Sequence, residues 1–178
     1  MPRVSNAEKQ KSHRRIVEVA ARLFREQGIE ATGLAEIMSA AGMTHGGFYR
    51  HFANKDELVR EAFDSAFNAS IATLVDTPEN ENDNKAFSDY LDMYLSLEHV
   101  SKPGIGCPIA AIGSELQRQD IDVAESVKQV AMLLGKESDP YLGYARLSMI
   151  VGAVTLARLM YGDDDAEMVL EAATRSMS

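Results

Sequence analysis

Residues 42–58 carry the strongest structural signal in the chain and read G-M-T-H-G-G-F-Y-R-H-F-A-N-K-D-E-L. Thr44 follows Gly42 by two residues and belongs to a residue type that favours the position before a helix, so we predict a tight turn and then a short helix. Phe48 and Phe52 lie four residues apart and share one face of that helix, and the phenol of Tyr49 points away from it. This stretch predicts a helix with one anchored face and one free face.

The flanking segments also predict helices. From Ser12 to Gln27, apolar residues recur at intervals of three and four, and Gly28 is the expected end. Thr32 can cap a second, short helix that is stopped by a glycine. Asn54 precedes a fourth helix, which has a charged first turn and then an apolar series. Four helices therefore occupy the first 75 residues.

The remainder of the chain predicts further helices and no strand. A polar run at 76–85 separates two long helices, and no segment alternates with the period of two that a strand requires. We therefore predict an all-α protein. The expected helices cover 87–97, about 108–119, 123–134, 140–160 and 163–176.

Charge is distributed unevenly along the chain. The net charge is −9, but residues 1–60 carry 10 Lys and Arg against 7 Asp and Glu, and residues 61–178 carry 8 against 20. The first third can therefore approach a polyanion, and the remainder is repelled by one. We expect a cytoplasmic protein without a membrane partner, because the start of the chain lacks an apolar signal and the most apolar segment, 147–160, contains Arg158.

The 45 residues from Arg14 to Leu58 resemble the N-terminal signature of the TetR family of bacterial transcriptional regulators. The family's A-G-V-S turn is matched at 42–44, its G-x-L/F-Y-x-H/Y-F recognition helix at 46–52, and its x-K-E/D-x-L entry at 54–58. The resemblance implies an N-terminal three-helix helix-turn-helix DNA-binding domain at 1–54. It also implies a helical ligand-sensing and dimerisation domain at 55–178 that dimerises through a four-helix bundle.

The same resemblance implies a repressor and not an enzyme. Its expected partners are double-stranded DNA with an inverted-repeat operator, a second copy of the chain, and a small-molecule effector of unknown identity that releases the DNA. No glycine-rich phosphate loop or metal-ligand cluster is apparent, so we expect neither a cofactor nor a metal.

The DNA contacts that we expect fall into two groups. Phosphates would be held by Thr32, Thr44, Tyr49 and Lys55, and base edges would lie nearest His45, Gly46 and Arg50. Gly46 and Gly47 are poor helix formers, which suggests close backbone approach to the DNA. Capping alone is an equal explanation for the two threonines. Gly33 and Leu34 stand where the family has Thr or Ser and a β-branched residue, so the second helix is expected to start loosely.

The body contains weaker candidates for a ligand or sensor site. Cys107 precedes Pro108 at a predicted helix N-terminus, where the helix dipole can lower the pKa of a thiol, and the alternative is a buried, inert cysteine. Gly152 and Ala153 are expected to let a helix approach its twin closely. The candidate pocket residues, which can equally be core, are Tyr90, Tyr94, Met132, Tyr144 and Met149.

Two other functions remain open from the sequence. One is a dimer that senses a small molecule, an electrophile or an oxidant and has lost DNA binding, which the modest head charge and Gly33 favour. The other is an enzyme that uses Cys107 as nucleophile and His99 as base.

Overall fold

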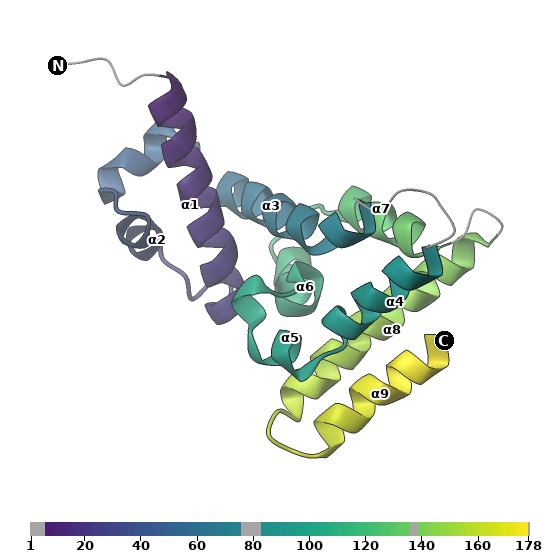
Figure 1. Ribbon diagram of the computed structural model, residues 1–178. Coiled ribbons are helices and arrows are strands. Elements are labelled where there is room, and N and C mark those ends of the chain that lie inside the picture. Colours follow the sequence, from purple (N-terminus) through teal and green to yellow (C-terminus); the bar gives the residue numbers. More distant parts are fainter. Residues whose placement is uncertain (1–5, 76–82, 136–138, 178) are drawn as a thin grey trace.

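The computed structural model describes residues 6–75, 83–135 and 139–177, and the elements in these ranges are all helices (Figure 1). The predicted all-α class is confirmed. In chain order the elements are α1 (Asn6–Gln27), α2 (Leu34–Ala40), the 3₁₀ helix η1 (His45–Arg50), α3 (Lys55–Val75), α4 (Asp83–Tyr94), α5 (Leu97–Ser101), the 3₁₀ helix η2 (Pro103–Ile105), α6 (Pro108–Arg118), α7 (Ala124–Leu134), α8 (Pro140–Leu159) and α9 (Asp165–Met177).

The head is formed by α1, α2, η1 and the first half of α3. Gly28 and Gly42 have φ angles of +91° and +75°, so the turns after α1 and α2 use backbone conformations that favour glycine. The amide oxygen of Asn54 accepts a hydrogen bond from the Glu57 N–H at 2.9 Å, and the Glu57 carboxylate accepts from the Ala53 N–H at 2.5 Å. These two bonds, which together resemble a capping box, fix the start of α3 at Lys55.

Two details of the predicted head are wrong. Gly33, and not Thr32, is the N-cap residue of α2, and no side chain caps this helix. The short helix after Thr44 is a 3₁₀ helix, and the Thr44 side chain does not cap it.

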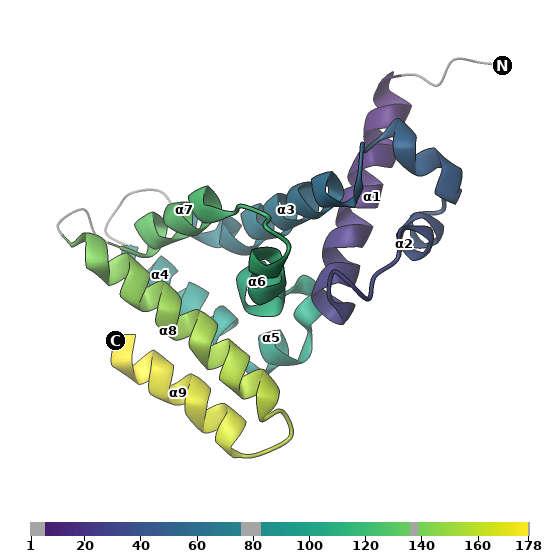
Figure 2. The same cartoon turned by 180° about the vertical axis from the view of Figure 1, so that it is seen from behind.

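The body is a group of helices at the other end of α3 (Figure 1). α8 packs against α7 and α9. The two opposite views in Figures 1 and 2 show α8 running beside α9, along the edge of the molecule farthest from α1. Arg146 joins three helices: its Nη1 donates to the carbonyl oxygen of Leu134 at the end of α7, at 2.8 Å, and its guanidinium lies 4.1 Å from the ring centre of Phe87 in α4.

The predicted helix over 87–97 is divided in the structure. α4 ends at Tyr94 and α5 begins at Leu97, because the Ser96 hydroxyl accepts the His99 N–H at 3.1 Å and caps a new helix. Of the predicted polar run at 76–85, residues 76–82 lie outside the described residues.

Among the described residues, one segment, Tyr141–Leu159 of α8, is long and apolar enough to cross a membrane by length and composition alone. One third of this segment is buried, against α5, α6, α7 and α9. Ala153 faces this interior with 5 % exposure, which corrects its expected place at a contact with a twin helix, whereas a Cβ at Gly152 would meet no atom within 4 Å.

Close backbone contact between α7 and α8 depends on Gly143. A Cβ at this position would overlap the carbonyl oxygen of Ala131. Gly143→Ala should therefore lower the free energy of unfolding by about 3 kcal/mol, the upper part of the range for overpacked sites, in urea denaturation followed by circular dichroism. Gly113→Ala is the matched control, because its Cβ would make only an ordinary 3.6 Å contact with Ile109. Equal stability of the two variants would contradict this account.

Candidate nucleic-acid interface

The outer side of η1 is a small exposed surface, and the opposite side of this helix is packed into the core. Phe48 and Phe52 are buried, and their rings are 5.5 Å apart, as the four-residue spacing predicts. Tyr49 is 68 % exposed, and its ring lies nearly perpendicular to that of Phe48, with ring centres 5.2 Å apart. The neighbouring exposed residues, which with Tyr49 we call the η1 face, are Thr44, His45, Gly46 and Arg50.

The two glycines of η1 are not required by packing within the chain. A Cβ at Gly46 would meet no atom within 4 Å, and one at Gly47 would make ordinary contacts with Met38 at 3.6 Å and Thr44 at 3.7 Å. A helix interior normally favours alanine over glycine by about 1 kcal/mol, and packing within the described residues gives no reason for glycine at either position. Their effect is to leave the backbone of the η1 face uncovered.

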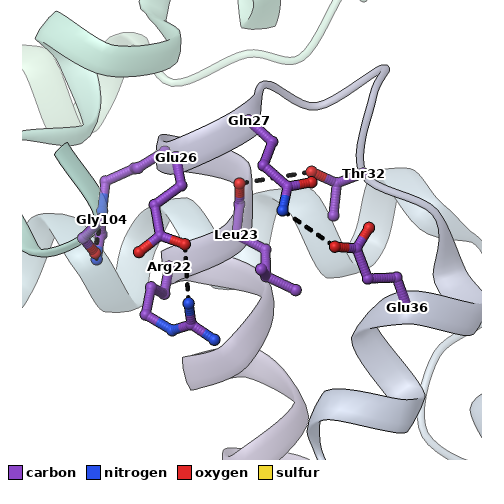
Figure 3. Close-up of polar contacts among 8 residues, drawn as sticks. Arg22, Leu23, Glu26, Gln27, Thr32, Glu36 and Gly104 are labelled. Carbon is purple, nitrogen blue, oxygen red and sulfur yellow. Dashed lines mark hydrogen bonds and ion pairs between the residues drawn. The ribbon is translucent and has the colours of Figure 1, made fainter.

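Thr32 does not belong to this surface. Its side chain is completely buried, and its hydroxyl donates to the carbonyl oxygen of Gly28 at 2.6 Å. The same hydroxyl lies 3.5 Å from the carbonyl oxygen of Leu23 (Figure 3). The expected phosphate contact of Thr32 is therefore wrong, because the hydroxyl is turned into the end of α1. Figure 3 also shows the Gln27 amide donating to the Glu36 carboxylate at 3.0 Å, which ties the same end of α1 to α2.

Lys55 is engaged within the chain. Its Nζ donates to the carbonyl oxygen of Ile29 at 2.6 Å and lies 5.9 Å from the ring centre of Phe24, and the residue is half-buried. An ammonium has three donors, so the contact with Ile29 leaves two for other partners. Lys55 thus stabilises the turn after α1, a role that its place in the motif did not indicate.

Two histidines, His13 and His51, lie on the side of η1 opposite the η1 face. The Nε2 of His13 lies 2.6 Å from a Glu61 carboxylate oxygen, joining α1 to α3, and its ring stacks on Phe52 with centres 4.5 Å apart. The pKa of His51 is lowered, first by burial and then by the nearby His13, so its neutral form is favoured.

A second cluster lies in the body. Tyr90, Tyr94 and Cys107 are buried together, and the two tyrosine rings are 5.4 Å apart. Two of the other candidates lie on α8: Tyr144 is 48 % exposed, and Met149 is half-buried against the core. The third, Met132 of α7, is 79 % exposed. The structure therefore brings two of the five predicted pocket residues, Tyr90 and Tyr94, together with Cys107.

Cys107 stands at the N-cap position of α6, as predicted, but its thiol is not activated. Burial raises its pKa, and the opposing contributions of Tyr94, of the first amides of α6 and of Arg158 are smaller. The expectation that the helix dipole lowers this pKa is wrong, because desolvation of the charged form outweighs the dipole at a buried site.

His99 is not placed to act as a base for Cys107. Its Nδ1 lies 2.5 Å from the carbonyl oxygen of Tyr94, and its Nε2 accepts the backbone N–H of Cys107 at 2.9 Å. Both ring nitrogens are therefore occupied by backbone groups, and burial also lowers the pKa of His99. This geometry argues against the enzyme hypothesis, because a general base needs a free nitrogen directed at the nucleophile.

Two arginines around Cys107 were not predicted as site residues. Arg25 of α1 donates to the carbonyl oxygen of Gly104 through Nε, at 3.0 Å, and also through Nη2. Arg158 of α8 donates to the carbonyl oxygen of Val100 at 3.4 Å. Burial lowers the pKa of both guanidinium groups. Sequence spacing could not reveal this cluster, because its members come from α1, α4, α5, α6 and α8.

The head matches known proteins in sequence. Residues 16–62 match the family model described as bacterial regulatory proteins, tetR family. The HTH-type transcriptional regulator AcrR of Shigella flexneri is 42 % identical over 64 residues, which are 36 % of this chain and 30 % of that protein. The head belongs to the tetR family of bacterial regulatory proteins. A second relative, the HTH-type transcriptional repressor KstR2 of Mycobacterium tuberculosis, is 44 % identical over 46 residues, or 26 % of this chain and 23 % of its own length.

The TetR-type fold extends beyond the head. A TetR transcriptional regulator from Chloroflexus aurantiacus superposes with a TM-score of 0.74, covering 96 % of this chain and 94 % of that one at 24 % identity. This likeness confirms the predicted arrangement of a helix-turn-helix head and a helical body. The matched segments span about a third or less of the length of these two relatives.

Burial makes a clear prediction for Cys107. In the native protein at pH 8, alkylation by iodoacetamide should be at least about ten-fold slower than in guanidinium-unfolded protein, because the thiol is inaccessible and its raised pKa reduces the thiolate fraction. Mass spectrometry of timed samples measures both rates. Equal rates would show an accessible thiol and would support the sensor hypothesis instead.

Proposed function

We propose that this TetR-family protein is a DNA-binding transcriptional repressor that acts as a homodimer on an inverted-repeat operator and is released by a small-molecule effector. The observation that carries the proposal is the η1 face: a short helix with buried phenylalanines on one side and exposed polar groups beside bare glycine backbone on the other. A helix of this kind can enter a major groove while its rear side remains in the protein core.

The proposed contacts follow from exposure. His45, Gly46 and Arg50 are placed at base edges, and Thr44 and Tyr49 at phosphates, with Gly47 allowing the close approach. Lys55 is retained only as a secondary phosphate contact, because one of its donors is already bound to Ile29. We assign residues 1–54 to DNA binding and 55–178 to ligand sensing and dimerisation. The head core nevertheless crosses this boundary, since Leu58 and Val59 of α3 are completely buried.

Dimerisation is proposed to use the outer side of α8 together with α9 in a four-helix bundle. A stripe of exposed or half-buried residues recurs along α8 at intervals of three and four: Tyr141, Tyr144, Ser148, Gly152, Leu156 and Leu159. Tyr141 and Leu159 are 82 % and 80 % exposed, and Met168 of α9 is 65 % exposed. An exposed apolar stripe of this length is typical of a protein–protein contact. Two-fold pairing of this stripe would provide two heads for an inverted repeat.

The effector is proposed to contact the cluster of Tyr90, Tyr94 and Cys107. The Tyr94 hydroxyl lies beside the Cys107 sulfur and, like Nη2 of Arg158, is buried without an oxygen or nitrogen partner among the described residues. Buried polar atoms are nearly always hydrogen-bonded, so a ligand with polar groups would satisfy these two. Because the partners of this chain would be DNA, itself and a small molecule, we propose that it acts in the cytoplasm.

Selection from genomic DNA tests the proposal. Purified protein is mixed with sheared DNA of its own genome at moderate salt, and the retained fragments are sequenced. We expect enrichment of an inverted repeat. Retention of no sequence by a folded, dimeric protein would instead favour a sensor that has lost DNA binding.

Tyr49→Ala should weaken binding to all sequences and reduce the salt dependence by about one phosphate contact, because a phosphate contact carries no sequence information.

His45→Ala is the matched variant, because it changes another exposed residue of the same face. It should alter which bases are enriched while leaving the salt dependence unchanged. A uniform loss on all sequences would contradict its place at a base edge. Circular dichroism should match the wild-type protein for both variants, since neither side chain is buried.

The dimer proposal has its own test. Gly152→Glu places a charge where a single subunit offers open space, so it should not unfold the chain, but it would put two charges at the paired helices. Sedimentation velocity should give a mass near twice 19.5 kDa for the wild-type protein and near 19.5 kDa for the variant. Ser114→Glu, at an exposed site on α6, is the control and should remain dimeric. A dimeric Gly152→Glu protein would exclude this face.

A further inference from the structure

The turn between α1 and α2 is bound by side chains from three parts of the chain. The Thr32 hydroxyl donates to the Gly28 carbonyl oxygen at 2.6 Å, and Lys55 Nζ donates to the Ile29 carbonyl oxygen at 2.6 Å. The third side chain is that of Glu115, in α6 of the body, whose Oε2 accepts the Ile29 N–H at 2.7 Å. Every polar backbone group from the Gly28 carbonyl to the Ile29 carbonyl is therefore held by a side chain.

The contact with Glu115 is specific in shape and in charge. Ile29 is 1 % exposed, and Gly28 lies so close to the carboxylate that a Cβ there would be 2.9 Å from Oε1. A carboxylate binds the N–H of Ile29 and an ammonium binds its C=O, so each end of this residue meets the charge that its dipole favours. Such charge-assisted bonds are stronger than neutral ones, and a buried N–H that loses its acceptor is costly.

Head and body are joined at both ends of α6. Glu115 holds the head near the C-terminal end of this helix. In front of its N-terminal end, Arg25 of α1 donates to the carbonyl oxygen of Gly104 in η2. Figures 1 and 2 show α6 next to the end of α1 from both sides. A displacement of α6 therefore acts on the turn that leads directly into α2, and α2 packs on η1.

We propose that Glu115 is a positioning residue for DNA binding: through the Ile29 amide it sets the placement of α2 and the η1 face relative to the body. This inference rests on the proposed function, since it assigns to a body residue a part in presenting the η1 face. Glu115 itself touches no DNA, because its carboxylate is directed at the turn. Its role is to transmit a change in the position of α6 to the η1 face.

The test uses the full-length chain and two variants of one residue. Glu115→Ala removes the acceptor, and Glu115→Gln keeps an oxygen that can accept the Ile29 N–H. Glu125→Ala, an exposed glutamate of α7 whose weak pairing with Lys128 is at the surface, is the control. Hydrogen–deuterium exchange of the peptide covering residues 24–33 reports on the turn without any DNA. Fluorescence anisotropy on the genomic repeat enriched by the wild-type protein reports on DNA affinity.

In Glu115→Ala we expect the Ile29 amide to exchange about ten-fold faster and DNA affinity to fall about ten-fold, with the helical content and dimeric mass unchanged. Glu115→Gln should keep both close to wild type, and Glu125→Ala should match wild type. Unchanged exchange in Glu115→Ala overturns the proposal, as does faster exchange with unchanged DNA affinity, which would make the contact a local brace. A wild-type chain that selects no DNA would overturn the proposed function and, with it, the proposed role of Glu115. The hydrogen–deuterium exchange result does not depend on DNA binding, so it tests the contact between Glu115 and Ile29 in either case.

Discussion

The arrangement of the head depends on the burial of Phe48 and Phe52 in a core that is shared by α1 and α3. Both rings are at most 2 % exposed, and this burial fixes the rotation of η1 about its axis. Loss of one such ring from a core typically costs about 3–5 kcal/mol, which is a large part of the stability of a small domain. Tyr49 and the neighbouring glycines can therefore face outward only because their neighbours are held inward. The position of the η1 face is thus a consequence of core packing.

The same core joins the DNA-binding segment to the body. α3 starts in the head and ends in the body, and the side chains of Lys55 and Glu115 bind opposite ends of Ile29 in the turn between α1 and α2. A functional boundary at residue 54 is consequently not a boundary in packing. In the proposed function this continuity has a use, because a displacement of α6 would reach the η1 face through direct contacts instead of a flexible linker.

The Cys107 cluster illustrates a competition between two effects of known sign. A helix N-terminus favours a thiolate by about 0.3–1 kcal/mol at exposed sites, whereas burial of a charge costs several kcal/mol. Because the thiol is buried, the second effect prevails and the pKa rises. His99, which could have offset this as a partner, binds two backbone groups instead. The cluster thus holds the polar backbone around η2 and presents the hydroxyl of Tyr94 inside the body.

The sequence by itself determined the helical class, most helix ends, and the family resemblance of residues 14–58. These features depend on neighbours in the chain: apolar spacing, glycines with positive φ such as Gly28, and the Asn54 cap. It also predicted which face of η1 is buried, since Phe48 and Phe52 are four residues apart. The break at Ser96 was missed because the apolar pattern continues across it.

Only the tertiary structure decided which candidate residues are free to act. In the structure Thr32 is buried, Lys55 is hydrogen-bonded within the chain, and the pKa of Cys107 is raised. Tyr144 is separated from Tyr94, and Arg25, Arg158 and Glu115 make contacts that residue spacing in the sequence does not predict. The physical reason is that burial and hydrogen-bond partners are set by residues far away in the chain. Ile29 and Glu115, for example, are separated by 86 positions.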